Sequence, residues 1–85
     1  MIYFKKMWQS AERNLIMKKG IYEHYKGNKY ELLSIARHSE TLEEMVVYKA
    51  LYGDGDIWVR PAHMWDEEVS VGGNKVPRFK LIEEM

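Results

Sequence analysis

The sequence predicts a small, mainly β domain in which five or six short antiparallel strands and one short helical turn form a barrel. Three observations support this prediction. At 85 residues without cysteine, the chain can build one core and has no disulfide to staple it. Eight of the eleven aromatic residues lie between Gly20 and Phe79, where short β-prone runs alternate with turn residues. Strands this close together are expected to close on themselves, because closure removes exposed strand edges.

Residues 1–16 differ from the rest of the chain. The segment MIYFKKMWQSAERNLI shows neither strand alternation nor a sustained helical stripe, whereas the β pattern begins at Gly20. We therefore expect an N-terminal leader over residues 1–16 and the β domain over residues 17–85. The leader is interpreted as a flexible segment or a misassigned start, with Met17 as the native first residue. A short amphipathic helix that packs on the barrel is the alternative.

The first two strands are predicted over residues 21–25 and 29–36, on either side of a Lys-Gly-Asn turn. In the second strand, the adjacent Leu32 and Leu33 interrupt the alternation of side chains. Such an interruption predicts a bulge or a strong bend at that point.

The next two strands, over residues 45–52 and 57–60, form the clearest hairpin, because Asp54-Gly55 supplies the positive φ angles that a tight turn requires. With these two residues at its centre, Tyr52 opposes Ile57. Alternation then gives the strands an outward face with Trp58 and Arg60. The core face comprises Tyr48, Ala50, Tyr52, Ile57 and Val59.

Two further segments are less regular. Residues 41–44 match a capping box, so a helix over residues 41–52 competes with the strand, but Val46 and Val47 favour the strand. A short helical turn over residues 62–67 is expected next, followed by a strand near residues 69–71, a Gly-Gly-Asn turn and a last strand over residues 78–82.

The chain also resembles a known family. The resemblance rests on six motifs, GIYEHYKG at 20–27, HSET at 38–41, VVY at 46–48, LYGD at 51–54, WVRP at 58–61 and PRF at 77–79. Over about residues 18–82 these motifs are similar to the bacterial family catalogued as domain of unknown function 1653. Trp65 departs from the pattern, since members often have Phe there. The resemblance implies an SH3-like small barrel and no established activity, and the leader has no counterpart in it.

The three histidines are candidates for metal ligands or catalytic residues. His24, His38 and His63 lack the close spacing of a ligand motif, so we expect no metal and no cofactor. His38 and Glu40 have the chemistry of a general acid and base pair, which makes a small hydrolase or transferase one alternative function. A side-chain network that orders the loop before the third strand is the favoured interpretation.

A binding surface is the leading hypothesis, because aromatic side chains next to an arginine offer stacking and anion contacts in a chain too short for an elaborate catalytic site. The candidate ligand-binding residues are Tyr22, His24, Tyr25, His38, Glu40, Trp58 and Arg60. We expect a non-enzymatic module that recognises a small polar ligand, a nucleotide or a protein segment. An accessory protein that assembles through a strand edge is the other alternative.

Charge and composition restrict the partners. The formal net charge is zero, and residues 17–85 carry a slight acidic excess, which does not favour a nucleic-acid partner. No apolar run approaches the ~18 residues of a membrane span, and no secretory signal is apparent. With no cysteine present, we expect a cytoplasmic protein that is a monomer or a weak dimer.

Overall fold

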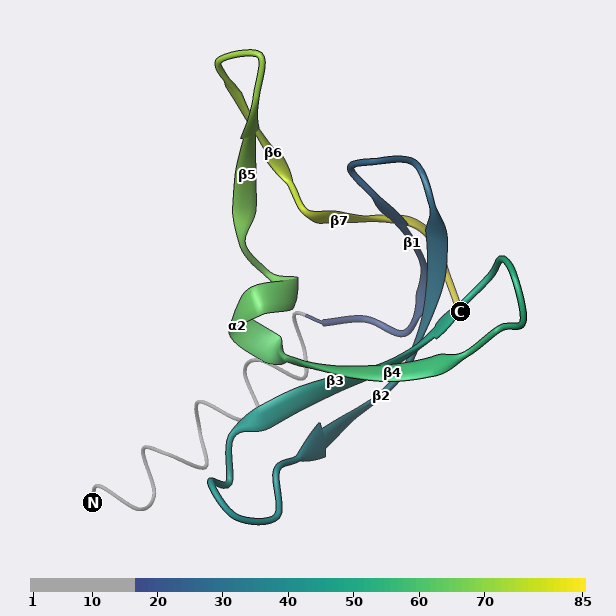
Figure 1. Cartoon of the computed structure of the whole chain (residues 1–85), viewed down its shortest axis with the longest axis vertical. Coiled ribbons are helices and arrows are strands. Elements are labelled where there is room, and N and C mark those ends of the chain that lie inside the picture. Colours follow the sequence, from purple (N-terminus) through teal and green to yellow (C-terminus); the bar gives the residue numbers. More distant parts are fainter. Residues whose placement is uncertain (1–16) are drawn as a thin grey trace.

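The computed structural model describes residues 17–85, and the leader expected over residues 1–16 lies outside the described part. Its elements are β1 (Gly20–His24), β2 (Lys29–Arg37), β3 (Glu44–Ala50), β4 (Ile57–Pro61), α2 (Ala62–Trp65), β5 (Glu68–Val71), β6 (Asn74–Pro77) and β7 (Phe79–Glu84) (Figure 1). The prediction of a mainly β domain of short antiparallel strands with one helical turn is confirmed. The competition over residues 41–52 is decided in favour of a strand, β3.

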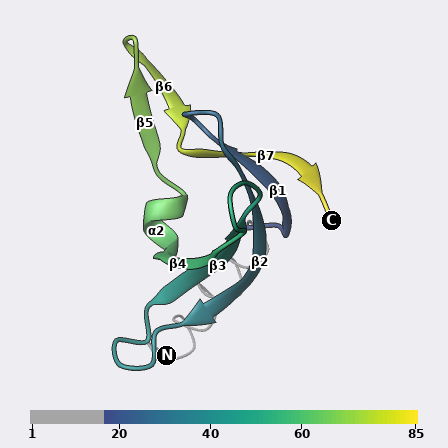
Figure 2. The same cartoon turned by 45° about the vertical axis from the view of Figure 1, so that its right-hand side comes forward.

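The strands form two antiparallel sheets. One has five strands in the order β4-β3-β2-β1-β7, and the other is the β5–β6 hairpin. The larger sheet curls around α2, as the turned view shows (Figure 2). Within residues 17–85 it does not close, because β4 and β7 stay at its two ends without pairing. The expected barrel is therefore open: α2 and the β5–β6 hairpin connect the two edge strands along the chain in place of hydrogen bonds between them.

The bend expected in the second strand is present. The pairing of β2 with β3 shifts between Leu32 and Ser34, where β2 contains a bulge.

Close packing of β1 against β7 explains why residue 20 is a glycine. Gly20 has a φ of 154°, and a Cβ atom there would collide with the carbonyl oxygen of Glu83 in β7. Only glycine lets β1 and β7 approach this closely.

The expected register of the β3–β4 hairpin is wrong by three residues. Tyr48 pairs with Trp58 and Lys49 with Ile57, so the connection spans residues 51–56 instead of two residues. Gly53 and Gly55 both have positive φ angles, of 58° and 70°. A tight two-residue turn and this wider loop are both compatible with a segment that contains two glycines, and nothing in the local sequence chooses between the two.

This odd-numbered shift exchanges the two faces of β4. Ile57 and Val59, expected in the core, are 61% and 62% exposed. Tyr48 and Ala50 are buried, as expected, whereas Tyr52 lies in the loop and is exposed. Trp58 and Arg60, expected on the outward face, lie on the same face as Tyr48, because cross-strand partners share a face.

The core is mainly aromatic. Its buried cluster comprises Met17, Tyr22, Leu32, Val46, Tyr48, Ala62, Trp65 and Phe79. Trp65 of α2 stacks on Phe79 of β7, with ring centroids 3.8 Å apart and an interplanar angle of 4°. Tyr22 and Tyr48 pack against the same indole at 5.2 and 4.9 Å. Each such aromatic pair adds about 1 kcal/mol beyond simple burial, so this short helix anchors both ends of the sheet.

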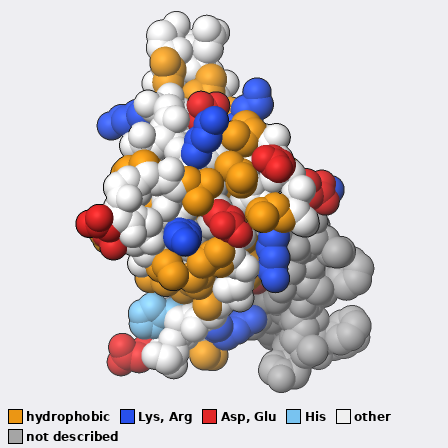
Figure 3. All heavy atoms as spheres, turned by 90° about the vertical axis from the view of Figure 1, so that its right-hand side faces the viewer, with side chains coloured by type: hydrophobic (Ala, Val, Ile, Leu, Met, Phe, Trp, Pro, Cys, Tyr) orange, Lys and Arg blue, Asp and Glu red, His pale blue; other side chains and the backbone are white. Residues whose placement is uncertain are grey.

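The surface of the domain is mixed in character. On the face shown in Figure 3, hydrophobic side chains gather over the middle while basic and acidic side chains are interspersed around them. Within residues 17–85, no helix has the length and apolar character needed to cross a membrane.

Candidate ligand-binding face

One side of the core cluster reaches the surface as a face of aromatic and polar side chains, which we call the aromatic face. It comprises His24, Tyr30, Tyr48, Tyr52, Trp58, Arg60 and Phe79. The registers of the sheet build it: Tyr48 of β3 lies opposite Trp58 of β4, and Tyr30 of β2 lies opposite Ala50. Neighbouring strands thus place their large side chains on one side of the sheet.

Arg60 is the cation of the aromatic face. Its Cζ atom lies 5.4 Å from the centroid of the Phe79 ring, and its Nε–H donates a long hydrogen bond of 3.4 Å to the Tyr48 hydroxyl. The side chain is half-buried. Among residues 17–85, the ion pairs join Lys18 to Glu84, His63 to Glu43, and Arg78 to Glu67, and none involves Arg60. The guanidinium is therefore a half-buried positive charge without a carboxylate partner among residues 17–85.

Two tyrosine hydroxyls form a second polar feature of this face. The hydroxyl oxygens of Tyr30 and Tyr52 are 2.8 Å apart, and their rings meet edge to face with centroids 5.5 Å apart. Burial, and after it the hydrogen bond with Tyr52, raises the pKa of Tyr30 to about 12. The Tyr30 hydroxyl is therefore neutral, and the half-exposed Tyr52 ring is open to a stacking partner.

His24 borders the face at the end of β1. Its ring contacts Phe79 edge to face at 4.9 Å, and its Nδ1 accepts a hydrogen bond of 3.2 Å from the Lys26 backbone N–H. Burial lowers the pKa of His24, and the positive charges of Arg78, Arg60 and Lys26 lower it further. The imidazole is therefore neutral at neutral pH, and its surroundings are positive.

Tyr25 lies beside His24 in the β1–β2 turn, on the wall of a hollow. Lys26 Nζ and Arg78 Cζ lie 5.8 and 5.9 Å from its ring centroid, and the ring is partly exposed. The hollow has a volume of about 480 Å³ and is lined by Glu23, His24, Tyr25, Gly27, Val71, Val76, Pro77 and Lys80. Arg78 itself forms an ion pair, because Glu67 Oε1 lies 3.0 Å from its Nε and 2.9 Å from its Nη2.

Tyr22 lies away from this surface. It is buried in the core, where its ring packs against Trp65 and its hydroxyl donates a hydrogen bond of 2.6 Å to the Lys18 carbonyl oxygen. Burial raises the pKa of its hydroxyl, and the hydrogen bond partly opposes that effect. Tyr22 therefore has a structural position.

His38 and Glu40 lie in the loop between β2 and β3. His38 Nδ1 accepts hydrogen bonds from the backbone N–H groups of Glu40 and Thr41, at 3.1 and 3.3 Å, and its own carbonyl oxygen accepts one from the Leu42 N–H. Within residues 17–85, no hydrogen bond, ion pair or ring contact joins either residue to the aromatic face. Within the same residues, no hydrogen bond or ion pair joins the Glu40 carboxylate to the His38 imidazole. The described residues also contain no group of three potential metal ligands.

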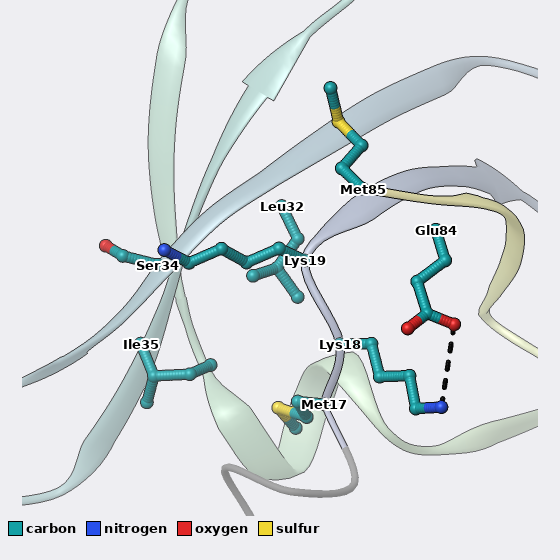
Figure 4. Close-up of a pocket in the computed structure, with 8 residues that line it drawn as sticks. All are labelled: Met17, Lys18, Lys19, Leu32, Ser34, Ile35, Glu84 and Met85. Atoms are coloured by element: carbon teal, nitrogen blue, oxygen red, sulfur yellow. Dashed lines mark ion pairs between the residues drawn. The ribbon is translucent and has the colours of Figure 1, made fainter.

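A second hollow, of about 490 Å³, lies at the start of the described chain (Figure 4). Leu32 and Ile35 form part of its floor, and the Lys19 side chain extends across it toward Ser34. Lys18 Nζ and Glu84 Oε1 form an ion pair of 3.5 Å at its edge. This pair balances the charge of Lys18 at the edge of the hollow.

Sequence reasoning missed Tyr30 and Phe79 as members of the face. Tyr30 precedes Leu32 by two positions, so alternation alone puts both on one side of β2. For Phe79 no local signal was available, because its place beneath Arg60 depends on β7 folding back beside β1.

The comparisons with known proteins agree with this fold. The family model described as Protein of unknown function (DUF1653) matches residues 20–81. A protein of the same family from Bordetella bronchiseptica, for which a crystal structure is known, is 35% identical in sequence to this chain. The match covers 85% of this chain and 95% of that one, with a TM-score of 0.77. No curated protein matches the chain.

Proposed function

The chain belongs to the DUF1653 family, and from its own geometry we propose that it is a non-enzymatic binding module. Its ligand is a small anion that carries a planar group, of the nucleotide type, held on the aromatic face. The observation that carries this proposal is the guanidinium of Arg60, which is half-buried over Phe79 and has no carboxylate partner among the described residues.

A half-buried cation without a counter-charge among the described residues is costly to maintain for stability alone. A phosphate or carboxylate satisfies it, because the planar guanidinium offers paired N–H donors in a geometry that matches those anions. The Phe79 ring beneath the guanidinium restricts it to one orientation, so that less freedom is lost on binding.

The rings around Arg60 suit the planar part of the ligand. Trp58 and Tyr52 are 50% and 47% exposed, which leaves room for stacking on one side of each ring. Stacking on an aromatic side chain contributes about 1–3 kcal/mol per base. The Tyr52 hydroxyl adds a group at the edge of the face that can donate and accept hydrogen bonds.

The charge distribution favours a small anion over a nucleic-acid polymer. A polymer is held by a stripe of basic side chains that displaces many counterions. The chain as a whole is neutral, and residues 17–85 carry a slight acidic excess. One unpaired arginine matches one anionic group.

The bacterial cytoplasm is the proposed location. A relative from Bordetella bronchiseptica and the absence of cysteine from the sequence support it. The alternative of a hydrolase that uses His38 has no comparable support, since its Nδ1 is engaged by the loop backbone.

The test is an amide NMR titration of the full chain with ATP, AMP, flavin mononucleotide and inorganic phosphate at low salt. We expect shifts that cluster on Tyr52, Trp58 and Arg60, and binding at least about tenfold weaker in Arg60→Met, which keeps the apolar stem but loses the charge. Lys75→Met, in the β5–β6 hairpin, is the matched control and should bind normally. A spectrum of the wild-type chain unchanged by all four compounds would refute a nucleotide-type ligand.

A further inference from the structure

The outer side of β4 presents free backbone groups. The Ala50 N–H donates to the Asp56 carbonyl oxygen at 2.9 Å, and hydrogen-bonded pairs in an antiparallel ladder recur at every second residue. Trp58 and Arg60 therefore direct their N–H and C=O groups toward β3. Ile57 and Val59 direct theirs away from the sheet, where β4 has no neighbouring strand among the described residues.

The side chains on this strand are also apolar and accessible. Ile57, Trp58 and Val59 are three consecutive residues with exposed fractions of 61%, 50% and 62%. Edge strands of soluble proteins are usually protected by charges, in particular lysine, or by irregular geometry. β4 has a single charged residue, Arg60, and that side chain turns back over Phe79. The edge is thus suited to pairing with another strand.

We propose that β4 pairs with β4 of a second copy of this chain, antiparallel and centred on Val59, so that the two sheets become continuous. In this register the two Val59 residues exchange both of their backbone hydrogen bonds. Ile57 of each copy lies opposite Pro61 of the other copy. The pairing ends there, because proline has no N–H to return.

The sequence of β4 is complementary to itself in this register. On the outer face Val59 meets Val59 and Ile57 meets Pro61, so apolar groups cover apolar groups. On the aromatic face Trp58 of each copy comes opposite Arg60 of the other, which pairs an aromatic ring with a cation. No two like charges oppose each other. A second copy brings both halves of this match, which is why it is the partner we infer.

The pairing also extends the aromatic face across the two-fold axis. Trp58 of the second copy lies beside Arg60, so each Arg60 gains a second ring at the side that Phe79 leaves open. The interface is small, since five residues per strand give a seam of about 17 Å. A seam of this length buries less surface than the roughly 1,200 Å² that is typical of stable complexes. We therefore expect a weak dimer with a dissociation constant on the order of 100 µM.

The dimer does not depend on the proposed ligand, and it is measured on the full chain without any addition. In sedimentation velocity runs from about 10 µM to about 1 mM, the mean mass should rise from 10.2 kDa toward twice that value. Over the same range, the amide signals of Ile57 and Val59 should shift in NMR spectra. A mass that stays monomeric at the highest concentration overturns the proposal.

Variants show whether the association uses this edge. Val59→Lys places two ammonium groups opposite each other and should weaken association at least about tenfold. Val71→Lys makes the same change at an exposed valine of the β5–β6 hairpin and should leave association unchanged. A dimer that survives in folded Val59→Lys, or is lost equally in both variants, contradicts the proposal. If Val59→Lys does not fold, the concentration-dependent amide shifts decide, and shifts confined to another surface refute the β4 pairing.

Discussion

The two edge strands of the sheet, β4 and β7, differ in the side chains that they carry. β4 exposes three consecutive apolar residues and carries one charge. β7 carries Lys80, Glu83 and Glu84, and it buries Phe79 in the core. Charged side chains on an edge oppose pairing with another chain, and apolar ones permit it. The difference teaches that β7 combines an anchor in the core with charges that oppose pairing, whereas the side chains of β4 permit pairing.

The largest expected effect comes from removing the residue by which β7 is attached to the core. Phe79→Ala deletes the ring that stacks on Trp65 and supports Arg60, and should lower the free energy of unfolding by about 3–5 kcal/mol. Urea unfolding measures the change. Ile82→Ala, at a largely exposed position of the same strand, is the control and should cost far less. Equal losses in the two variants would contradict the anchoring role of Phe79.

The next effect tests the close approach of β1 to β7. Gly20→Ala introduces a Cβ atom against the Glu83 carbonyl oxygen at a φ of 154°, and should destabilise the domain by about 2–3 kcal/mol. Gly72→Ala also places alanine at a positive φ, of 56°, but nothing lies within 4 Å of the new atom. Its cost should be about 1–2 kcal/mol. Thermal or urea unfolding compares the two, and a smaller loss for Gly20→Ala would show that β7 is not held at this contact.

The comparison of the two edges can be tested by placing a charged side chain on β4 and removing one from β7. Ile57→Lys on β4 and Lys80→Val on β7 are surface changes that should alter the free energy of unfolding by about 0.5 kcal/mol or less. Their effect on self-association should be opposite: Ile57→Lys lowers it and Lys80→Val raises it. Light scattering against concentration measures this. Reduced association in Lys80→Val would mean that edge charge does not govern contacts between copies.

The smallest effect concerns His24, whose pKa is affected by the positive charges of Arg60 and Arg78. Its pKa is lowered in the folded state, mainly by burial, so the unfolded chain binds more protons as the pH falls. The contribution of His24 to stability is therefore complete above the unfolded pKa of about 6.5 and is lost as the pH falls below it. NMR titration of its ring should give a midpoint below about 6.5.

Two variants separate the causes of this shift. Arg60→Met should move the midpoint of His24 upward, because one of the nearby positive charges is removed. Lys75→Met should not move it, since Lys75 is not among the charges that act on His24. A midpoint of His24 above that of an ordinary histidine would contradict the positive surroundings inferred for the aromatic face.

The sequence by itself determined the class of the fold and several of its local features. Glycine, asparagine and aspartate placed most of the turns, and the Leu32-Leu33 pair indicated the bulge in β2. The family motifs were recognisable without coordinates, and Trp58 and Arg60 were identified as neighbours on one face. These features depend on interactions between residues close together in the chain, which is why local sequence carries them.

Only the tertiary structure decided which face that is and what lies beneath it. A three-residue shift in the register of the β3–β4 pairing reverses the faces of β4, because side chains alternate with a period of two. Phe79 reaches Arg60 from the far end of the chain, and His38 and Glu40 remain in a separate loop. The open sheet has the same origin: whether β4 meets β7 depends on how α2 packs Trp65 against the core, and that packing joins residues distant in sequence.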